Sequence, residues 1–135
     1  MSSRPKVLIV DDEERFRTTL HKLLATRQIE AAHVGSAKEA FSEIAKNEYD
    51  VILLDLKMPE MNGIEALGKI KKENPQIEVI ILTGHASVDA AVEIMKLGGY
   101  EYLLKPCAID ELVGKIESAW ERKLLRGKKT PDANS

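Results

Sequence analysis

The stretch VILLDLKMPEMNG, Val51–Gly63, places four apolar residues directly before an aspartate. An apolar run of this length is typical of a strand that is buried on both faces of a parallel sheet. An unpaired carboxylate inside a core would cost several kcal/mol, so we expect the strand to carry Asp55 to the edge of the sheet. Pro59 and Asn62–Gly63 are turn signals that lead the chain away from that edge.

Short apolar runs occur at four other places, and we interpret them as further strands of the same sheet. Most of their residues are β-branched, aliphatic or aromatic, which favours strands, although the second run contains two alanines, which are poor strand formers. The predicted strands besides Val51–Leu54 are Lys6–Val10, Ala31–Val34, Val79–Leu82 and Tyr100–Leu104.

Amphipathic segments with helical spacing of their apolar residues separate these runs. Ser36 followed by Glu39 forms the pattern of a capping box, and Ser87 is a candidate N-cap. The residues predicted to face the core are Phe16, Leu20, Leu23 and Leu24 in the first helix, Ala40, Phe41 and Ile44 in the second, Ile64, Leu67 and Ile70 in the third, Val88, Ala91, Val92 and Met95 in the fourth, and Leu112, Val113, Ile116, Ala119, Trp120 and Leu124 in the fifth.

The order strand–helix therefore repeats five times, which predicts an α/β fold. We expect a doubly wound five-stranded parallel sheet with helices on both faces. A length of 135 residues fits one domain, since domains cluster at about 100–150 residues. We predict that the domain covers residues 1–122 and that residues 123–135 form a helix end and a polar tail, frayed from Arg126 onwards.

Composition excludes several classes of function. The net charge of −2 does not favour binding to nucleic acid. The basic residues near the C-terminus are typical of the end of a helix. No apolar run approaches the roughly 18 residues of a membrane span or forms a secretory signal. The single cysteine, Cys107, excludes an intramolecular disulfide framework and suits a reducing compartment. We expect a cytoplasmic protein without direct contacts to nucleic acid or membrane.

Polar residues follow four of the five predicted strands. In open parallel α/β sheets, functional sites form beyond the carboxyl ends of the strands. The second strand ends in Gly35–Ser36 and adds no charge. The residues that follow the first, third, fourth and fifth strands are Asp11 and Asp12, then Asp55, then Thr83 and Gly84, and finally Lys105 and Pro106. Three carboxylates, one hydroxyl and one ammonium should therefore meet at one edge.

Three neighbouring carboxylates need a counter-charge. At an effective dielectric near 20, a pair of like charges about 4 Å apart repels by up to about 4 kcal/mol. Oxygen ligands favour a hard cation such as Mg²⁺ or Mn²⁺, and Lys105 adds a positive charge. A cation, an ammonium and a carboxylate nucleophile together describe a site for phosphoryl transfer onto an aspartate.

Four stretches carry a resemblance to a known family: VLIVDDEERFR (Val7–Arg17), DVILLDLKMPEMNGIE (Asp50–Glu65), VIILTGHAS (Val79–Ser87) and GGYEYLLKPCAIDELVGKI (Gly98–Ile116). In this order and spacing they resemble the receiver domain of two-component response regulators, over about Lys6–Arg122. The resemblance implies the flavodoxin-like strand order 2-1-3-4-5.

The resemblance also implies a role for each residue at the sheet edge. Asp55 corresponds to the phosphoacceptor, which takes a phosphoryl group from a histidine kinase or a phosphotransfer protein. Asp12 and Asp55 would bind Mg²⁺ directly, Asp11 more often through water, and the backbone carbonyl of Lys57 would complete the protein ligands. Lys105 would bind the phosphoryl oxygens.

A further set of residues corresponds to the switch of the family. Thr83 would turn its hydroxyl towards the phosphate, and Tyr102 would move inward behind it. Gly84 would keep the approach to the phosphate open. The resemblance also implies that the Lys105–Pro106 bond is cis. Such bonds are rare, since only about 5–6% of X–Pro bonds in folded proteins are cis.

We therefore expect a signalling switch that catalyses only its own phosphorylation and dephosphorylation. Phosphorylation would reshape the face formed by residues 87–120, which a downstream protein, an output domain or a second copy in a homodimer would recognise. One alternative is a Mg²⁺-dependent phosphatase or phosphotransferase with an aspartyl nucleophile, but Lys57 stands where haloacid-dehalogenase-type enzymes have a second aspartate. The other is a non-phosphorylated binding module with the receiver fold. The sequence leaves open whether the chain is a stand-alone receiver or part of a longer regulator.

Overall fold

The computed structural model describes residues 4–85 and 87–132 and contains one sheet of parallel strands. The strand order is β2-β1-β3-β4-β5, so the predicted α/β class and its flavodoxin-like order are confirmed. The strands are β1 Lys6–Val10, β2 Glu30–Val34, β3 Val51–Leu54, β4 Glu78–Thr83 and β5 Glu101–Leu104. Each predicted strand exists, and the boundaries differ from the prediction by no more than one residue at either end.

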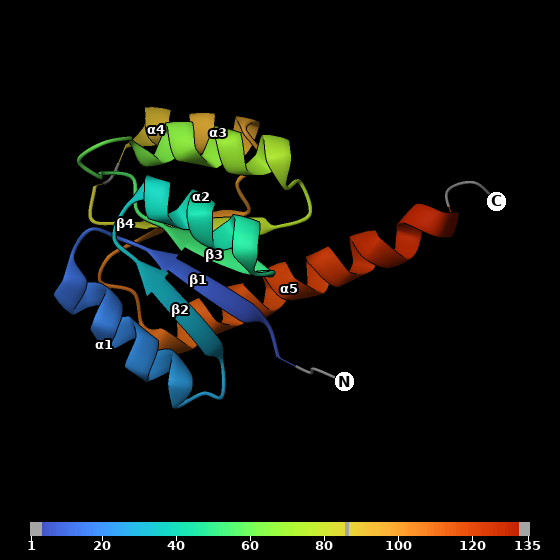
Figure 1. Ribbon diagram of the computed structural model, residues 1–135, viewed down its shortest axis with the longest axis horizontal. Helices are drawn as coiled ribbons and strands as arrows, with labels where there is room; N and C mark the ends of the chain where they lie inside the picture. Colours follow the sequence, from blue (N-terminus) through green and yellow to red (C-terminus); the bar gives the residue numbers. More distant parts are fainter. Residues whose placement is uncertain (1–3, 86, 133–135) are drawn as a thin grey trace.

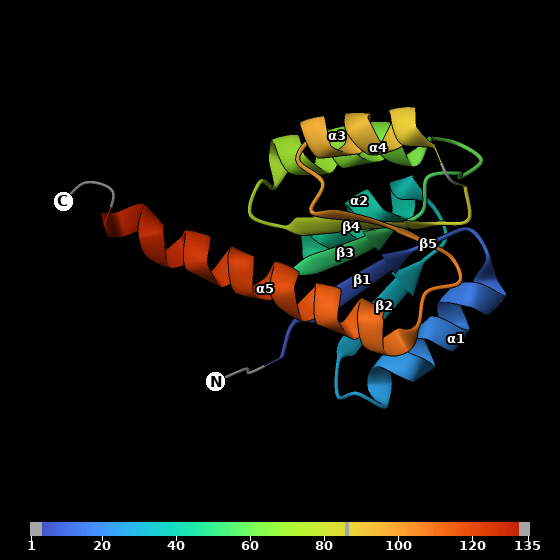
Figure 2. The same cartoon turned by 180° about the vertical axis from the view of Figure 1, so that it is seen from behind.

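Helices cover both faces of the sheet. Figures 1 and 2 show α1 and α5 on one face and α2, α3 and α4 on the other. The helices are α1 Glu14–Ala25, α2 Ala37–Lys46, α3 Gly63–Glu73, α4 Val88–Lys96 and α5 Ile109–Asp132. None of the helices in the described part of the chain combines the length and the apolar character needed to cross a membrane.

Alternate residues of the central strands supply two separate cores. Leu8 and Ile52 pack with the helices of the α2–α3–α4 face, whereas Ile9 and Leu53 pack with those of the α1–α5 face. All four residues of β3 are buried, because both of its faces are covered. This two-sided burial explains why the strand reads as a continuous apolar run.

The predicted N-caps are present. The Ser36 hydroxyl accepts a hydrogen bond from the Glu39 N–H at 3.1 Å, and the Glu39 carboxylate accepts one from the Gly35 N–H at 2.7 Å. The Ser87 hydroxyl accepts from the Ala90 N–H at 3.1 Å. These side chains satisfy amide groups that have no partner within their helices.

The predicted inward face of α4 is wrong. Val88, Val92 and Met95 are exposed, with 80%, 49% and 51% of their surfaces accessible, whereas Ile94 is fully buried. This short helix carries apolar residues on two faces, and the packing of Ile94 decides which face turns inward. Two further residues that we expected to face the core, Leu23 in α1 and Leu124 in α5, are exposed.

The helix α5 is longer than predicted. It continues to Asp132, past the expected start of a frayed tail at Arg126, and Figure 1 shows it extending beyond the sheet. The last residues of the expected tail, 133–135, lie outside the described residues. Ion pairs at the amino-terminal edge of the sheet hold the helix: Lys123 Nζ lies 2.5 Å from Asp50 Oδ1, and Arg126 pairs with Glu78.

The buried Glu78 carboxylate lies close to two further basic side chains. Arg122 Nε lies 3.4 Å from Glu78 Oε2, and Lys71 Nζ lies 4.0 Å from Oε1. Lys71 also donates hydrogen bonds to the carbonyl oxygens of Pro75 and Ile77. Burial, followed by repulsion from the two arginines of α5, lowers the pKa of Lys71 to about 8.

The lowered pKa of Lys71 predicts how stability varies with pH. Between about 8 and its ordinary value of 10.5, the unfolded chain binds more protons at this residue than the folded protein does. The contribution of Lys71 to the free energy of unfolding therefore increases with pH across this window. Urea unfolding measures the free energy of unfolding of the wild type and of Lys71→Met. The value for the wild type should increase relative to that of the variant from pH 7.5 to 10. A difference independent of pH would contradict the prediction.

Gly99 makes a second prediction, because it leaves no room for a side chain. A Cβ atom there would lie 2.5 Å from Ile94 Cγ2 and 3.0 Å from the Ile94 carbonyl oxygen. We expect Gly99→Ala to lower the free energy of unfolding by about 1–3 kcal/mol through overpacking.

Gly114 supplies the matched control for this substitution. A Cβ atom there meets no described atom within 4 Å, so Gly114→Ala should raise the stability of α5 by about 0.5–1 kcal/mol. Chemical denaturation of both variants measures the contrast. Equal effects of the two substitutions would show that the contact with Ile94 is not tight.

Candidate functional site

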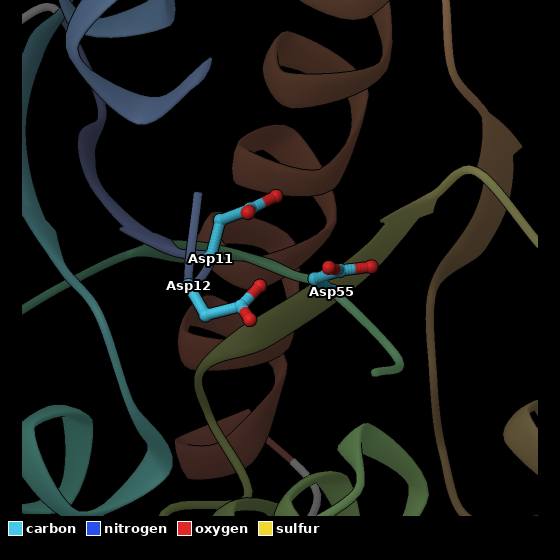
Figure 3. A group of neighbouring side chains, drawn as sticks. All are labelled: Asp11, Asp12 and Asp55. Atoms are coloured by element: carbon cyan, nitrogen blue, oxygen red, sulfur yellow. The ribbon is translucent and has the colours of Figure 1, made fainter. Parts of the chain in front are cut away.

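Three aspartates meet at the carboxyl edge of the sheet. Asp11 and Asp12 follow β1 and Asp55 follows β3, and one carboxylate oxygen from each lies within 4.8 Å of the other two. Figure 3 shows the three side chains close together. Asp11 and Asp55 are buried, whereas Asp12 is exposed. We call this group the acidic cluster; its donor set is consistent with a divalent-metal site.

Lys105 enters the acidic cluster from the end of β5. Its Nζ atom lies 2.6 Å from Asp11 Oδ2 and 4.0 Å from Asp55 Oδ2. A third carboxylate, that of Glu13, lies 3.5 Å away. The same ammonium lies over the ring of Phe16, 3.9 Å from its centroid. One positive charge therefore faces three negative groups and one aromatic ring.

Burial and pairing act in opposite directions on this ion pair. Burial raises the pKa of Asp11, although the hydrogen bond from Lys105 and the Glu13 N–H oppose that effect. Burial alone would lower the pKa of Lys105, but the hydrogen bond and charge of Asp11, with the charge of Asp55, outweigh it and raise that pKa. The raised pKa of Asp11 favours its neutral form and so disfavours an ion pair. The raised pKa of Lys105 favours its charged form and so favours the ion pair. The 2.6 Å contact supports the charged pair.

Backbone contacts fix the orientation of Asp55. Its Oδ1 accepts a hydrogen bond from the Leu56 N–H at 2.8 Å, and its own N–H donates to the Val10 carbonyl at 3.0 Å. The Gly63 N–H donates to the Leu56 carbonyl at 2.6 Å. A Cβ atom on Gly63 would lie 2.4 Å from the Asp55 carbonyl oxygen, so α3 can begin here only with glycine. The Asn-Gly pattern predicts a turn at Gly63 but does not indicate this close contact.

Residues of the loops after β3 and β4 line one cleft beside the acidic cluster. Lys57, Gly84 and His85 border an open cleft of about 250 Å³ together with Asp12, Glu13, Asp55 and Lys105. A Cβ atom on Gly84 would meet no described atom within 4 Å, so the space above this residue is open. Thr83, in contrast, is fully buried at the end of β4.

Thr83 and Tyr102 contact the backbone of the same residue. Thr83 Oγ1 accepts a hydrogen bond from the His85 N–H at 3.3 Å. The Tyr102 hydroxyl donates to the His85 carbonyl at 2.8 Å and accepts from the Ser87 N–H at 3.0 Å. Tyr102 is half-buried against the α2–α3–α4 core, and it lies against the β4–α4 loop rather than in the cleft. The Lys105–Pro106 bond next to this region is cis.

Arg17 of α1 supports the acidic cluster, a role that the sequence pattern does not indicate. Its Nη1 atom donates to the Asp11 carbonyl oxygen at 3.1 Å, and its Nε atom donates to His33 Nδ1 at 3.1 Å. No local motif marks this contact, because His33 lies sixteen residues away on β2. Arg17 thus links the turn after β1 to the neighbouring strand.

Comparison with known proteins agrees with this geometry. The profile of the response regulator receiver domain matches residues 7–117. The transcriptional regulatory protein ZraR of Escherichia coli O157:H7 is 36% identical over 125 residues, which are 93% of this chain and 28% of that protein. The chain therefore spans less than a third of this curated relative.

Solved structures of receiver domains superimpose closely on the chain. One from Clostridium thermocellum has a TM-score of 0.85 and 37% identity and covers 90% of this chain and 98% of its own. The beryllofluoride-activated NtrC4 receiver domain dimer has a TM-score of 0.83 and 36% identity, with coverage of 87% and 98%. The profile match over most of the chain, the strand order and the acidic cluster lead to one conclusion: the chain belongs to the response regulator receiver domain family, whose members are phosphoacceptor signalling modules rather than conventional enzymes.

Proposed function

We propose that Asp55 accepts a phosphoryl group from a phosphohistidine of a sensor kinase or of a phosphotransfer protein. The observation that carries this proposal is the position of the Asp55 carboxylate. It stands at the end of β3, within 4.8 Å of two other carboxylates and 4.0 Å from the Lys105 ammonium. Repulsion among the acids favours binding of a cation, and a bound cation together with the Lys105 ammonium would make the site suited to a group with negative oxygens and an electrophilic centre.

The transfer forms one bond and breaks one bond. A carboxylate oxygen of Asp55 attacks phosphorus, the phosphorus–nitrogen bond to the imidazole breaks, and the electron pair remains on that nitrogen. The product is an aspartyl phosphate. Asp55 Oδ1 already accepts the Leu56 N–H, whereas Oδ2 faces Lys105. The ammonium is therefore suited to binding the phosphoryl oxygens.

The acidic cluster is suited to hold Mg²⁺ or Mn²⁺. Asp11, Asp12 and Asp55 offer carboxylate oxygens, which hard cations prefer, and we assign the fourth protein ligand to the backbone carbonyl of Lys57. When bound, the cation neutralises charge on the transferring group. Asp12 is exposed at the cleft, and this access suits exchange of the ion with solvent.

We assign the response to phosphorylation to Thr83 and Tyr102. Both side chains bind the backbone of His85, one at its N–H and the other at its carbonyl oxygen. A movement of Thr83 towards a phosphoryl group would break or shift the first contact and thereby the loop that the second contact holds. Such a local change can bias two arrangements of a neighbouring surface.

The surface of residues 87–120 is the proposed output face. It includes the exposed apolar residues Val88, Val92 and Met95 of α4, with Leu104 of β5 beside Lys105. Exposed apolar groups of this kind suit contact with a protein partner. The partner can be a downstream protein, an output domain or a second copy of the chain, and the NtrC4 receiver is described as a dimer in its beryllofluoride-activated form.

The chain also matches only one part of longer regulators. ZraR, which its name describes as a transcriptional regulatory protein, extends well beyond the matched region. We propose that the receiver itself ends near Arg122 and that the rest of α5 connects it to whatever it controls. Both a stand-alone receiver and the receiver of a longer regulator agree with this proposal.

Phosphorylation of Asp55 can be tested directly. Incubation with Mg²⁺ and a small phosphodonor such as acetyl phosphate should add one phosphoryl group, detected by intact mass. Asp55→Asn should gain none, because the nucleophilic oxygen is lost, whereas Asp89→Asn in the first turn of α4 should react like the wild type. No gain with several donors, or an equal gain in Asp55→Asn, would overturn the proposal.

The metal site can be tested separately from the chemistry. Asp12 is exposed, so Asp12→Asn should leave the fold intact and weaken Mg²⁺ binding by about tenfold or more, since one ligand charge is lost. Calorimetric titration of Mg²⁺ measures the affinity, and Asp89→Asn again serves as the exposed control. In the wild type, Mg²⁺ should raise the melting temperature and its removal by a chelator should reverse the rise. Unchanged Mg²⁺ affinity in Asp12→Asn would exclude this residue as a ligand.

A further inference from the structure

The ammonium of Lys105 lies on the face of an aromatic ring. Its Nζ atom is 3.9 Å from the centroid of the Phe16 ring, well within the roughly 6 Å over which a cation is attracted to a ring face. Phe16 comes from the first turn of α1, and Lys105 from the end of β5. The contact therefore joins two elements that are far apart in the sequence.

The ring differs in kind from the three carboxylates around this ammonium. Asp11, Glu13 and Asp55 attract Lys105 with full negative charges at 2.6, 3.5 and 4.0 Å. A carboxylate that holds the lysine also repels an incoming phosphoryl group. An aromatic face attracts the cation through its quadrupole without a net charge, so it can hold the ammonium in place while leaving its charge available.

Burial makes the contact strong enough to matter. The Lys105 side chain is only 15% exposed, and Phe16 is half-buried against the α1–α5 core. Cation–π attraction is stronger where water is excluded than at exposed sites. A lysine has a flexible four-carbon stem, so a neutral contact that favours one position reduces the ordering required when a phosphoryl group binds.

We propose that Phe16 is a positioning residue for phosphoryl binding: its ring holds the Lys105 ammonium beside Asp55 without adding negative charge to the site. The inference rests on the proposed function, because it assigns Lys105 to the phosphoryl oxygens. It adds a contribution from α1 to a site whose charged residues come from the ends of the strands.

A change in ring electronics tests the proposal with little change in shape. Site-specific replacement of Phe16 by 4-fluoro-, 3,5-difluoro- and 3,4,5-trifluorophenylalanine weakens the ring quadrupole stepwise. The affinity for beryllofluoride in the presence of Mg²⁺, which mimics the phosphoryl group, should fall stepwise and reach a loss of about three- to tenfold. Mg²⁺ affinity without beryllofluoride should stay unchanged, because in the proposed role the ring acts on the binding of the phosphoryl oxygens and not on the metal ligands.

Phe41 provides the matched control within the same chain. It lies on α2 and packs against the other core, and no cation–π contact of Phe41 occurs in the described part of the protein. The same fluorinated residues at position 41 should leave beryllofluoride affinity unchanged. Phe16→Tyr, which keeps a π face, should remain close to the wild type, whereas Phe16→Leu should lose affinity. Thermal unfolding of each variant shows whether the fold persists.

The outcomes separate this inference from the proposed function. A wild type that binds no beryllofluoride with Mg²⁺ and gains no phosphoryl group overturns the proposed function itself. A wild type that binds, together with a flat response to fluorination at Phe16, overturns the positioning role alone. Equal losses at Phe16 and Phe41 would assign the effect to core packing and would also overturn it.

Discussion

Mutual repulsion among three carboxylates is the constraint on which the structure depends. Asp11, Asp12 and Asp55 offer oxygens within 4.8 Å of one another, a separation that charged groups avoid unless the backbone holds them. Pairing of β1 with β3 brings the ends of those strands together, and cores on both faces keep the strands in place. Lys105 supplies the opposite charge from β5. The stability of the apolar layers thus maintains an electrostatic arrangement that would not form by itself.

A short path leads from this arrangement to the surface. Thr83 ends the strand beside β3, and the backbone of His85 connects its hydroxyl to that of Tyr102. The Tyr102 hydroxyl in turn accepts a hydrogen bond from the N–H of Ser87, the N-cap residue of α4. Three hydrogen bonds therefore separate the buried end of β4 from the exposed apolar residues of α4. These contacts can link the proposed switch to the surface through neighbouring groups alone.

The sequence predicted those features that depend on local pattern. Continuous apolar runs indicated the strands because both faces of the sheet are buried, and the charged residues at the strand ends indicated the acidic cluster. It did not predict the inward face of α4, because Ile94 is selected by its fit against Gly99. The length of α5 depends on Glu78 and Asp50, which lie 48 and 73 residues away from their partners. The close approach of Gly63 to the Asp55 carbonyl and the cation–π contact of Lys105 with Phe16 likewise depend on contacts between elements.

The two ends of strand β4 carry residues with different roles. Its first residue, Glu78, binds the arginines of α5, and its last, Thr83, belongs to the proposed switch. Five residue steps of about 3.3 Å separate the two ends by roughly 17 Å. A strand paired on both sides does not stretch, so β4 works as a rigid spacer between the two edges of the sheet. An influence of the acidic cluster on the far end of α5 can therefore arrive as a rotation of packed elements, with no change in the distance between the two ends of β4.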